Sequence, residues 1–300
     1  MEVRLASLPL KTQLLATVAQ QVLHWQKHHL QPRLDVVLVG GNPASKIYVS
    51  MKGKTAQSVG IDFHLHHLPE HTTPAALYAT LDRLNADPAI HGILLQLPLP
   101  PQFDRLAALN RITPAKDVDG LTDASLLALE HNRPGLRPCT PLGIMRLLAW
   151  ADVPLRGANA VVVGRSRIVG KPVATMLDQA DATVSICHSK TMDLPAHLRQ
   201  ADVVIAAAGV PQLITGDMLK PGAVVIDVGI NSYVDSQGVS RLRGDCDYAS
   251  CASVAKYITP VPGGVGPMTV TSLMTNLLAA VVQQHPDHPP YPPLLDIVSP

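Results

Sequence analysis

The sequence predicts a two-domain α/β protein. At 300 residues the chain is about twice as long as a typical single domain. Short apolar runs alternate with patterns of helical period and recur at a spacing of roughly 30 residues, which is typical of parallel βαβ units. The prolines at 138 and 141 interrupt the chain between two such series. We therefore expect one domain from residues 1–138 and 270–300, and a second from residues 139–269.

Composition narrows the class of protein. Apolar residues make up 47% and charged residues 16%, which suits a globular protein with a sizeable core. The net charge of +1 favours neither a nucleic-acid nor a membrane partner. We find no run of about 18 apolar residues and no secretory signal, so we expect a cytoplasmic location. The four cysteines lack metal-binding spacing, which predicts structural thiols and no metal site.

The first half of the chain contains the elements of one parallel sheet. Leu10, Leu14 and Val18 mark one face of a helix, and apolar runs closed by Gly or Pro indicate strands. We expect helices over 8–30, 44–59, 74–85 and 102–112, and strands over 34–39, 61–68 and 90–97.

The second half repeats the pattern. We expect a helix ending at Trp150, strands over 161–163, 182–188, 201–209 and 223–230, and loops over 244–247 and 259–269. A helix over 270–284 is expected to return to the first domain. The last sixteen residues hold six prolines, which predicts an extended arm over 285–300.

One turn in the second half has the form of a phosphate-binding loop. Val163 ends an apolar run, and Gly164, Arg165, Ser166 and Gly170 follow before a helix. Backbone N–H groups at such a turn can bind phosphate. The spacing is Gly-x-Ser-x-x-x-Gly, however, so a plain strand-turn-helix corner is an equal alternative.

The next strand favours NADP over NAD. NAD-binding units carry an acidic residue at its end for the ribose hydroxyl. Here His188, Ser189 and Lys190 stand there, so no acid would repel a 2′-phosphate, and Arg165 supplies a cation. A solvent-facing loop charge is the alternative for Arg165. Gly209, after the following strand, would permit a ligand to approach closely.

Polar residues in the first half are candidates for a second site. Tyr48 and Lys52 lie one helical turn apart, although the spacing alone favours a surface lysine lying over a tyrosine. Gln96 ends a buried run, and an unpartnered buried amide costs roughly 1–3 kcal/mol, so it should have a partner or a ligand. Asp117 and Asp119 could be simple turn residues.

Six segments then follow one another in a characteristic order. They are Val39-Gly40 with Ala44-Ser45-x-x-Tyr48-Val49-x-x-Lys52; Gly92 to Pro100; Lys116 to Gly120; Pro138 to Pro141; Gly164-Arg165-Ser166-x-x-Val169-Gly170-x-Pro172; and Pro260 to Thr269. In this order they resemble the bifunctional methylenetetrahydrofolate dehydrogenase/methenyltetrahydrofolate cyclohydrolase family, from about residue 34 to residue 282.

The resemblance implies a folate-binding catalytic domain, a Rossmann-like NADP domain and two reactions. These are oxidation of 5,10-methylenetetrahydrofolate with NADP and hydrolysis of the methenyl product to 10-formyltetrahydrofolate. It also implies a homodimer. A single-activity dehydrogenase and a non-catalytic folate- or nucleotide-binding paralogue are the alternatives.

The resemblance also assigns roles to residues. It implies that Lys52 is the central catalytic residue, that Gln96 orients it, and that Tyr48 positions the folate ring. Further residues implied to bind folate are Asp119, through the pterin N–H groups, and Pro262, Gly263 and Gly264. Those implied to bind the cofactor are Gly164, Arg165, Ser166, Gly170, Ser189, Gly209 and Ile230.

The chain also departs from the family pattern. Leu8-Pro9-Leu10-Lys11 stands where the family has a Leu-x-Gly-Lys-like segment, and Cys246 replaces a Val between two acids. Cys251 and the proline-rich arm are unfamiliar as well. None of these departures falls on the implied catalytic residues, so they bear on subunit contacts and the arm.

Overall fold

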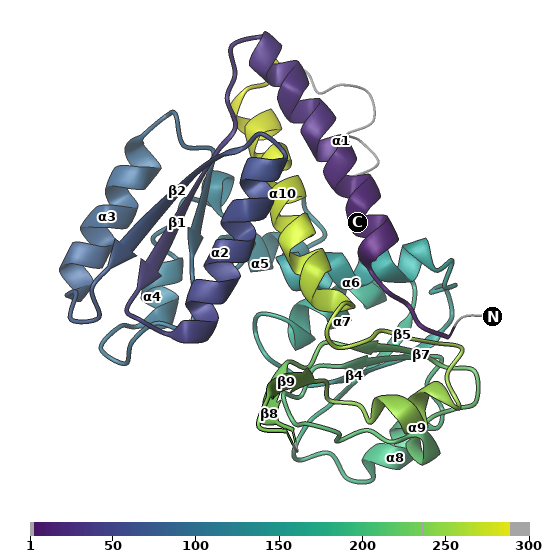
Figure 1. Ribbon diagram of the computed structural model, residues 1–300. Coiled ribbons are helices and arrows are strands. Elements are labelled where there is room, and N and C mark those ends of the chain that lie inside the picture. Colours follow the sequence, from purple (N-terminus) through teal and green to yellow (C-terminus); the bar gives the residue numbers. More distant parts are fainter. Residues whose placement is uncertain (1–2, 236, 289–300) are drawn as a thin grey trace. The chain divides into compact units, whose positions relative to one another are not determined.

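The computed structural model describes residues 3–235 and 237–288 (Figure 1). Most of the predicted arm, residues 289–300, lies outside this part. The chain divides into two compact units. We call residues 12–139 with 270–288 the first unit, and residues 3–11 with 140–269 the second unit. Each unit is an α/β structure with a parallel sheet, which confirms the predicted fold class.

The first unit holds a three-stranded parallel sheet in the order β2-β1-β3. Because both crossovers are right-handed, α2 and α3 lie on opposite faces of this sheet (Figure 1). The elements of this part of the chain are α1 (Leu8–Lys27), β1 (Arg33–Val39), α2 (Pro43–Ser58), β2 (Asp62–Leu68), α3 (Pro74–Ala86), β3 (Gly92–Leu95), α4 (Arg105–Leu109), η1 (Pro114–Lys116) and α5 (Asp123–Glu130).

The long helix α10 (Val265–Gln284) completes the core of the first unit. Its Leu273, Met274 and Leu277 pack in one apolar cluster with Leu34 and Val36 of β1. This confirms that the C-terminal helix returns to the first domain. The helix begins at Val265 rather than at 270, since Pro267 falls in its first turn, where the missing N–H breaks no helical bond.

Helix α10 is also long and strongly apolar. Within the described ranges it is the one helix whose length and composition would allow it to span a membrane. However, 78% of its apolar stretch is buried inside the protein. That burial is the pattern of a core helix.

The second unit holds a five-stranded parallel sheet in the order β10-β7-β6-β4-β5. A two-stranded antiparallel sheet, β8-β9, accompanies it. The elements are α6 (Cys139–Trp150), β4 (Asn159–Val163), α7 (Gly170–Gln179), β5 (Thr183–Cys187), α8 (Leu194–Leu198), β6 (Val203–Ala206), η2 (Gly216–Met218), β7 (Val224–Asp227), β8 (Asn231–Val234), β9 (Ser240–Arg243), α9 (Tyr248–Ala252) and β10 (Tyr257–Ile258).

Residues 3–11 differ from the predicted domain assignment, which placed them in the first domain. Leu5 N–H donates to the Ile258 carbonyl at 2.8 Å, and Ser7 N–H donates to the Gly263 carbonyl at 3.0 Å. This segment therefore satisfies backbone groups at the edge strand β10, and it clusters with the second unit.

A buried histidine directly before β3 predicts that the stability of the protein falls in acid. His91 is 3% exposed, its Nδ1 accepts the Arg33 N–H at 3.2 Å, and its Nε2 lies 3.0 Å from Nε2 of His285. Burial, followed by the charges of His285, Lys116 and Arg33, lowers the pKa of His91 from 6.5 to about 4.

As pH falls, His91 therefore takes up a proton in the unfolded chain before it does so in the folded protein. The contribution of His91 to the free energy of unfolding should be complete above pH 6.5 and should fall by about 2–3 kcal/mol as pH drops to about 4. Urea titrations across this range measure it. His91→Asn, which offers an acceptor that does not titrate, should show a smaller fall; an equal fall would contradict the assignment.

Candidate active site

The buried Lys52 is hydrogen-bonded to the partly buried Gln96 in the first unit. Lys52 lies on α2, is 8% exposed, and its Nζ donates to Gln96 Oε1 at 2.9 Å. Gln96 directly follows β3, and its N–H still donates to the Val37 carbonyl at 2.9 Å. Helix α2 thus presents the ammonium at the carboxyl end of a parallel strand, where open α/β sheets bind ligands.

The second amide atom of Gln96 fixes its orientation. Its Nε2 donates to the Leu97 carbonyl at 2.7 Å, so Oε1 must face Lys52. Both ends of this partly buried amide are therefore partnered. The Ser45 hydroxyl donates to the same Leu97 carbonyl at 3.4 Å and ties the first turn of α2 to this segment.

Tyr48 and Asp119 complete the first-unit group. Tyr48 lies one turn before Lys52, and burial raises the pKa of its hydroxyl. Burial also raises the pKa of Asp119, and the neighbouring Asp117 charge adds to this, while the Lys52 charge and a hydrogen bond with the Cys139 thiol oppose it. Asp119 therefore lies within electrostatic reach of Lys52, and the structure brings together four of the predicted residues.

The loop that carries Asp119 is held by neighbours whose roles the sequence did not indicate. Asp117 accepts from Thr122 N–H at 2.8 Å and from the Ser125 hydroxyl at 2.7 Å, and these bonds hold Thr122, the N-cap of α5, in place. Asn276 of α10 donates to the Val118 carbonyl at 2.9 Å. Of the two acids that flank Val118, Asp117 is therefore structural and Asp119 is the candidate for ligand binding.

Lys116 in the same loop caps α3. It is 8% exposed, and its Nζ donates to the Asn85 and Asp87 carbonyls at 2.8 and 2.7 Å. Burial lowers the pKa of Lys116, and the charges of Asp87 and Asp35 oppose the shift.

Lys116→Met should leave these carbonyls without a donor and lower the free energy of unfolding by about 1–3 kcal/mol. Urea denaturation measures the loss. Lys220→Met is the matched control, since Lys220 bonds Asp202 at 2.6 Å on the surface and should contribute less than about 1 kcal/mol. Equal losses in the two variants would contradict the capping role.

In the second unit, the predicted cofactor residues follow the carboxyl ends of neighbouring strands. Gly164 follows β4, Ser189 follows β5, Gly209 follows β6 and Ile230 follows β7. Since these strands are parallel, their carboxyl ends lie along one edge of the sheet. Strand β4 pairs with β5 on one side and β6 on the other, so Gly164 stands where the strand order reverses, the usual ligand position in such sheets.

The turn after β4 has no room for side chains at its glycines. Gly164 has φ +127°, and a Cβ there would lie 2.1 Å from the Ala207 carbonyl oxygen. A Cβ at Gly170 would lie 2.2 Å from the Gly164 carbonyl oxygen. The Ser166 hydroxyl accepts from Val169 and Gly170 N–H at 3.2 and 3.3 Å and shapes the start of α7. Arg165 beside it is exposed.

This edge fits a dinucleotide. Gly209 has φ +69° and open space where a Cβ would stand, so a ligand can approach its backbone. The Ala208 and Gly209 N–H groups both donate to Asp245 Oδ2 at 2.7 Å, which holds this loop in place. When bound, NADP supplies a hydride acceptor. Ser189 is exposed in the turn after β5, as a contact to a 2′-phosphate requires.

The three remaining predicted folate residues belong to the second unit. Gly263 has its carbonyl engaged by both Ser7 N–H at 3.0 Å and the Ser7 hydroxyl at 2.9 Å. Pro262 is exposed and Gly264 is buried. The structure therefore groups Tyr48, Lys52, Gln96 and Asp119 in one unit and places these three residues in the other.

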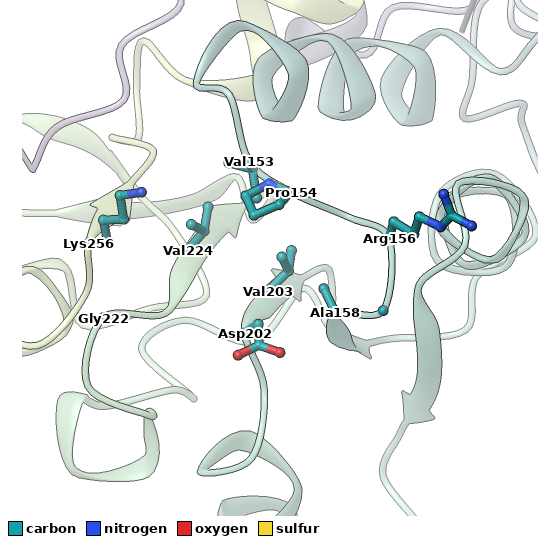
Figure 2. Close-up of a pocket in the computed structure, with 10 residues that line it drawn as sticks. Val153, Pro154, Arg156, Ala158, Asp202, Val203, Gly222, Val224 and Lys256 are labelled. Carbon is teal, nitrogen blue, oxygen red and sulfur yellow. The ribbon is translucent and has the colours of Figure 1, made fainter.

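A separate hollow of about 300 Å³ lies at the opposite edge of the second-unit sheet (Figure 2). Ala158, Val203 and Val224 line it at the amino ends of their strands. The Asp202 carboxylate in the hollow is already bonded by Lys220 and by the Asn159 N–H. The hollow therefore lies at the opposite edge from the carboxyl ends of β4, β5, β6 and β7, which we call the cofactor edge. The one carboxylate in the hollow, that of Asp202, already has its partners.

The fold and the glycine turn at the switch point define a two-domain α/β protein of the dinucleotide-binding class. Residues 5–119 match the catalytic domain, and residues 138–285 the NAD(P)-binding domain, of tetrahydrofolate dehydrogenase/cyclohydrolase. The chain belongs to this family, which confirms the family resemblance.

Similar sequences and solved structures support the same family assignment. The bifunctional protein FolD of Paraburkholderia phytofirmans is 52% identical over 277 residues, covering 92% of this chain and 96% of its own. The bifunctional FolD structure from Campylobacter jejuni has a TM-score of 0.90 and 41% identity, covering 93% of this chain and 98% of its own. The Trypanosoma brucei enzyme, complexed with NADP and an inhibitor, has a TM-score of 0.90 and 38% identity, covering 94% and 97%.

Proposed function

We propose that this protein oxidises 5,10-methylenetetrahydrofolate with NADP and hydrolyses the 5,10-methenyl product to 10-formyltetrahydrofolate. The observation that carries the proposal is the hydrogen bond of 2.9 Å from the buried Lys52 to Gln96, with Asp119 within electrostatic reach. A module that only binds folate has no need of a buried ammonium held in this way. One-carbon transfer for purine synthesis is the metabolic role that follows.

In the first reaction, a hydride leaves the methylene carbon between N5 and N10 and leaves a methenyl cation. The protein contributes position and electrostatics to this step. Asp119 accepts hydrogen bonds from the pterin N–H groups, and Tyr48 lies against the ring system. Pro262, Gly263 and Gly264 bring backbone close to the folate.

In the second reaction, water adds to the methenyl carbon and the bond from this carbon to N5 breaks. Lys52 passes the proton between the attacking water and N5. Gln96, whose amide orientation is fixed by the Leu97 carbonyl, holds Lys52 in position. The burial of Lys52 supports this role.

The cofactor is NADP, held by Gly164, Arg165, Ser166, Gly170, Ser189, Gly209 and Ile230. Arg165 and Ser189, both exposed, supply the contacts to the 2′-phosphate. Initial rates with NADP and NAD test this assignment, and a higher kcat/KM with NADP is expected. Arg165→Ala should narrow the difference between the cofactors, while equal cofactor rates in the unaltered protein would count against the assignment.

The absorbance of the methenyl intermediate tests the pairing of the two activities. With methylenetetrahydrofolate and NADP, NADPH should form and the methenyl compound should be hydrolysed. Accumulation of the methenyl compound would indicate a single-activity dehydrogenase instead. Binding of both ligands without turnover would indicate a non-catalytic paralogue.

Asp119→Asn tests the pterin contact. The amide keeps the size of the side chain but replaces one acceptor oxygen by a donor that faces pterin donors. We expect KM for the folate to rise by about 10–100-fold, the value of one or two charge-assisted hydrogen bonds, with a smaller change in KM for NADP. Steady-state kinetics with each substrate varied in turn measures both. An unchanged folate KM would remove Asp119 from the site.

We also propose a cytoplasmic homodimer. The family resemblance supports the dimer, and the composition supports the location. Light scattering coupled to gel filtration measures the mass directly, and a mass near that of one 32.0 kDa chain would overturn the dimer.

A further inference from the structure

Two cysteines that depart from the family pattern meet at the start of α9. Asp247 is the N-cap of this helix, so Cys246 precedes the cap and Cys251 is the fourth helical residue. Side chains at these two positions ordinarily pack against each other. Both thiols are buried, at 3% and 0% exposure, and both are free.

Contacts on both cysteines support this placement. Cys246 forms a parallel bridge with Ile214, and the Cys251 thiol donates to the Ile214 carbonyl at 3.4 Å. Both cysteines therefore contact the same residue, Ile214, from the N′ and N4 positions of one short helix. Cys139, by contrast, directs its thiol to the Val118 carbonyl. Cys246 and Cys251 therefore form a vicinal dithiol, which we call the α9 dithiol.

We propose that the α9 dithiol is a redox modification site, at which Cys246 and Cys251 form a reversible intramolecular disulfide when a hydroperoxide oxidises them. A cysteine pair that becomes oxidised transiently is the form that disulfides take in reducing compartments. The five-residue helix α9 has an exposed outer side, including Tyr248, so a local opening can admit a small peroxide.

The chemistry balances with one peroxide. The Cys251 thiolate attacks a peroxide oxygen, the O–O bond breaks, and the leaving oxygen takes up a proton, which leaves a sulfenic acid on Cys251. Cys246 sulfur then attacks Cys251 sulfur, the S–O bond breaks, and the hydroxide leaves as water with the Cys246 proton. The interaction with Cys246 lowers the pKa of the Cys251 thiol, which suits Cys251 to attack first.

The dithiol is joined directly to the cofactor edge. Cys246 follows Asp245, whose carboxylate holds the Ala208 and Gly209 N–H groups, and the Cys246 N–H donates to Asp227 Oδ2 at 2.9 Å. A disulfide brings the sulfurs to about 2.05 Å, closer than two free thiols can pack. Oxidation should therefore displace Asp245 and raise KM for NADP about 3–10-fold, a consequence that rests on the proposed function.

Peptide mapping tests the site without any assay of activity. Trypsin cleaves after Arg243 and Lys256 and releases both cysteines in one peptide, 244–256. After treatment of the folded protein with hydrogen peroxide and blocking of free thiols, this peptide should appear unblocked and about 2 Da lighter, and a thiol reductant should reverse the change. Sulfinic or sulfonic acids without a disulfide, or no oxidation of this peptide, would overturn the proposal.

Two variants distinguish the effect of the Cys246–Cys251 disulfide from the effect of oxidation elsewhere in the protein. Cys246→Val keeps an apolar side chain before the N-cap, and Cys251→Ala removes the attacking thiol. Both should lose the lighter peptide and the peroxide-dependent rise in KM for NADP, with Cys139 and Cys187 as internal controls that stay reduced. A rise in KM of the same size in either variant would overturn the link between the dithiol and the cofactor edge. If the unaltered protein showed no turnover, the mapping result would still decide the disulfide.

Discussion

Lys52→Met should slow hydrolysis of methenyltetrahydrofolate by about 10²–10⁴-fold, the usual contribution of a positioned proton-transfer group. Methionine keeps much of the length of the side chain but carries no proton. It also leaves Gln96 Oε1 without its donor at 2.9 Å. Oxidation of methylenetetrahydrofolate should fall less, because hydride transfer needs position rather than a proton carrier, so the methenyl compound should accumulate.

Absorbance of the methenyl compound and of NADPH, followed in one reaction, measures both steps. Lys54→Met is the matched control, since Lys54 is exposed two residues further along α2 and points to another side. That variant should keep both rates. Hydrolysis at the unaltered rate in Lys52→Met would show that Lys52 has no part in the proton transfer.

The elements that follow a clear period could be predicted, and short or paired ones could not. Helices α1, α2, α3 and α10 carry enough apolar periodicity to be found. The hairpin β8-β9 was missed because its residues are largely exposed, so no buried face marks it. The contacts of residues 3–7 with the second unit could not be predicted, since their partners, Ile258 and Gly263, are backbone groups more than 250 positions away.

The candidate site shows the same limit. The cost of burying an amide predicted only that Gln96 has a partner or a ligand, and the family resemblance named Lys52 as that partner. Asp117 and Asp119 could not be separated, because both are acids in one turn and only the backbone groups around Asp117 reveal its structural role. Asp227 and Asp245 went unnoticed for a similar reason. Their carboxylates bind backbone N–H groups of loops distant in sequence, and such partners leave no trace in residue type.

Gly164→Ala should strongly lower the stability of the second unit. At φ +127° an L-residue is strained by about 1–3 kcal/mol, and the new Cβ would stand 2.1 Å from the Ala207 carbonyl oxygen. That oxygen belongs to the loop after β6, which Asp245 holds, so it cannot move away alone. We expect a loss of at least about 3 kcal/mol in the free energy of unfolding and weak NADP binding in the fraction that folds.

Two further alanine variants distinguish the effect of backbone strain from the effect of a lost cofactor contact. Gly209 and Gly157 have φ +69° and +73°, and in both cases open space surrounds the missing Cβ. Alanine at either position should therefore cost a similar, smaller amount of stability. Only Gly209→Ala should also raise KM for NADP, by about tenfold or more, because its Cβ would occupy the space that we assign to the cofactor. If Gly157→Ala and Gly209→Ala raised that KM equally, backbone strain alone would account for both, and the cofactor would have to bind away from the end of β6.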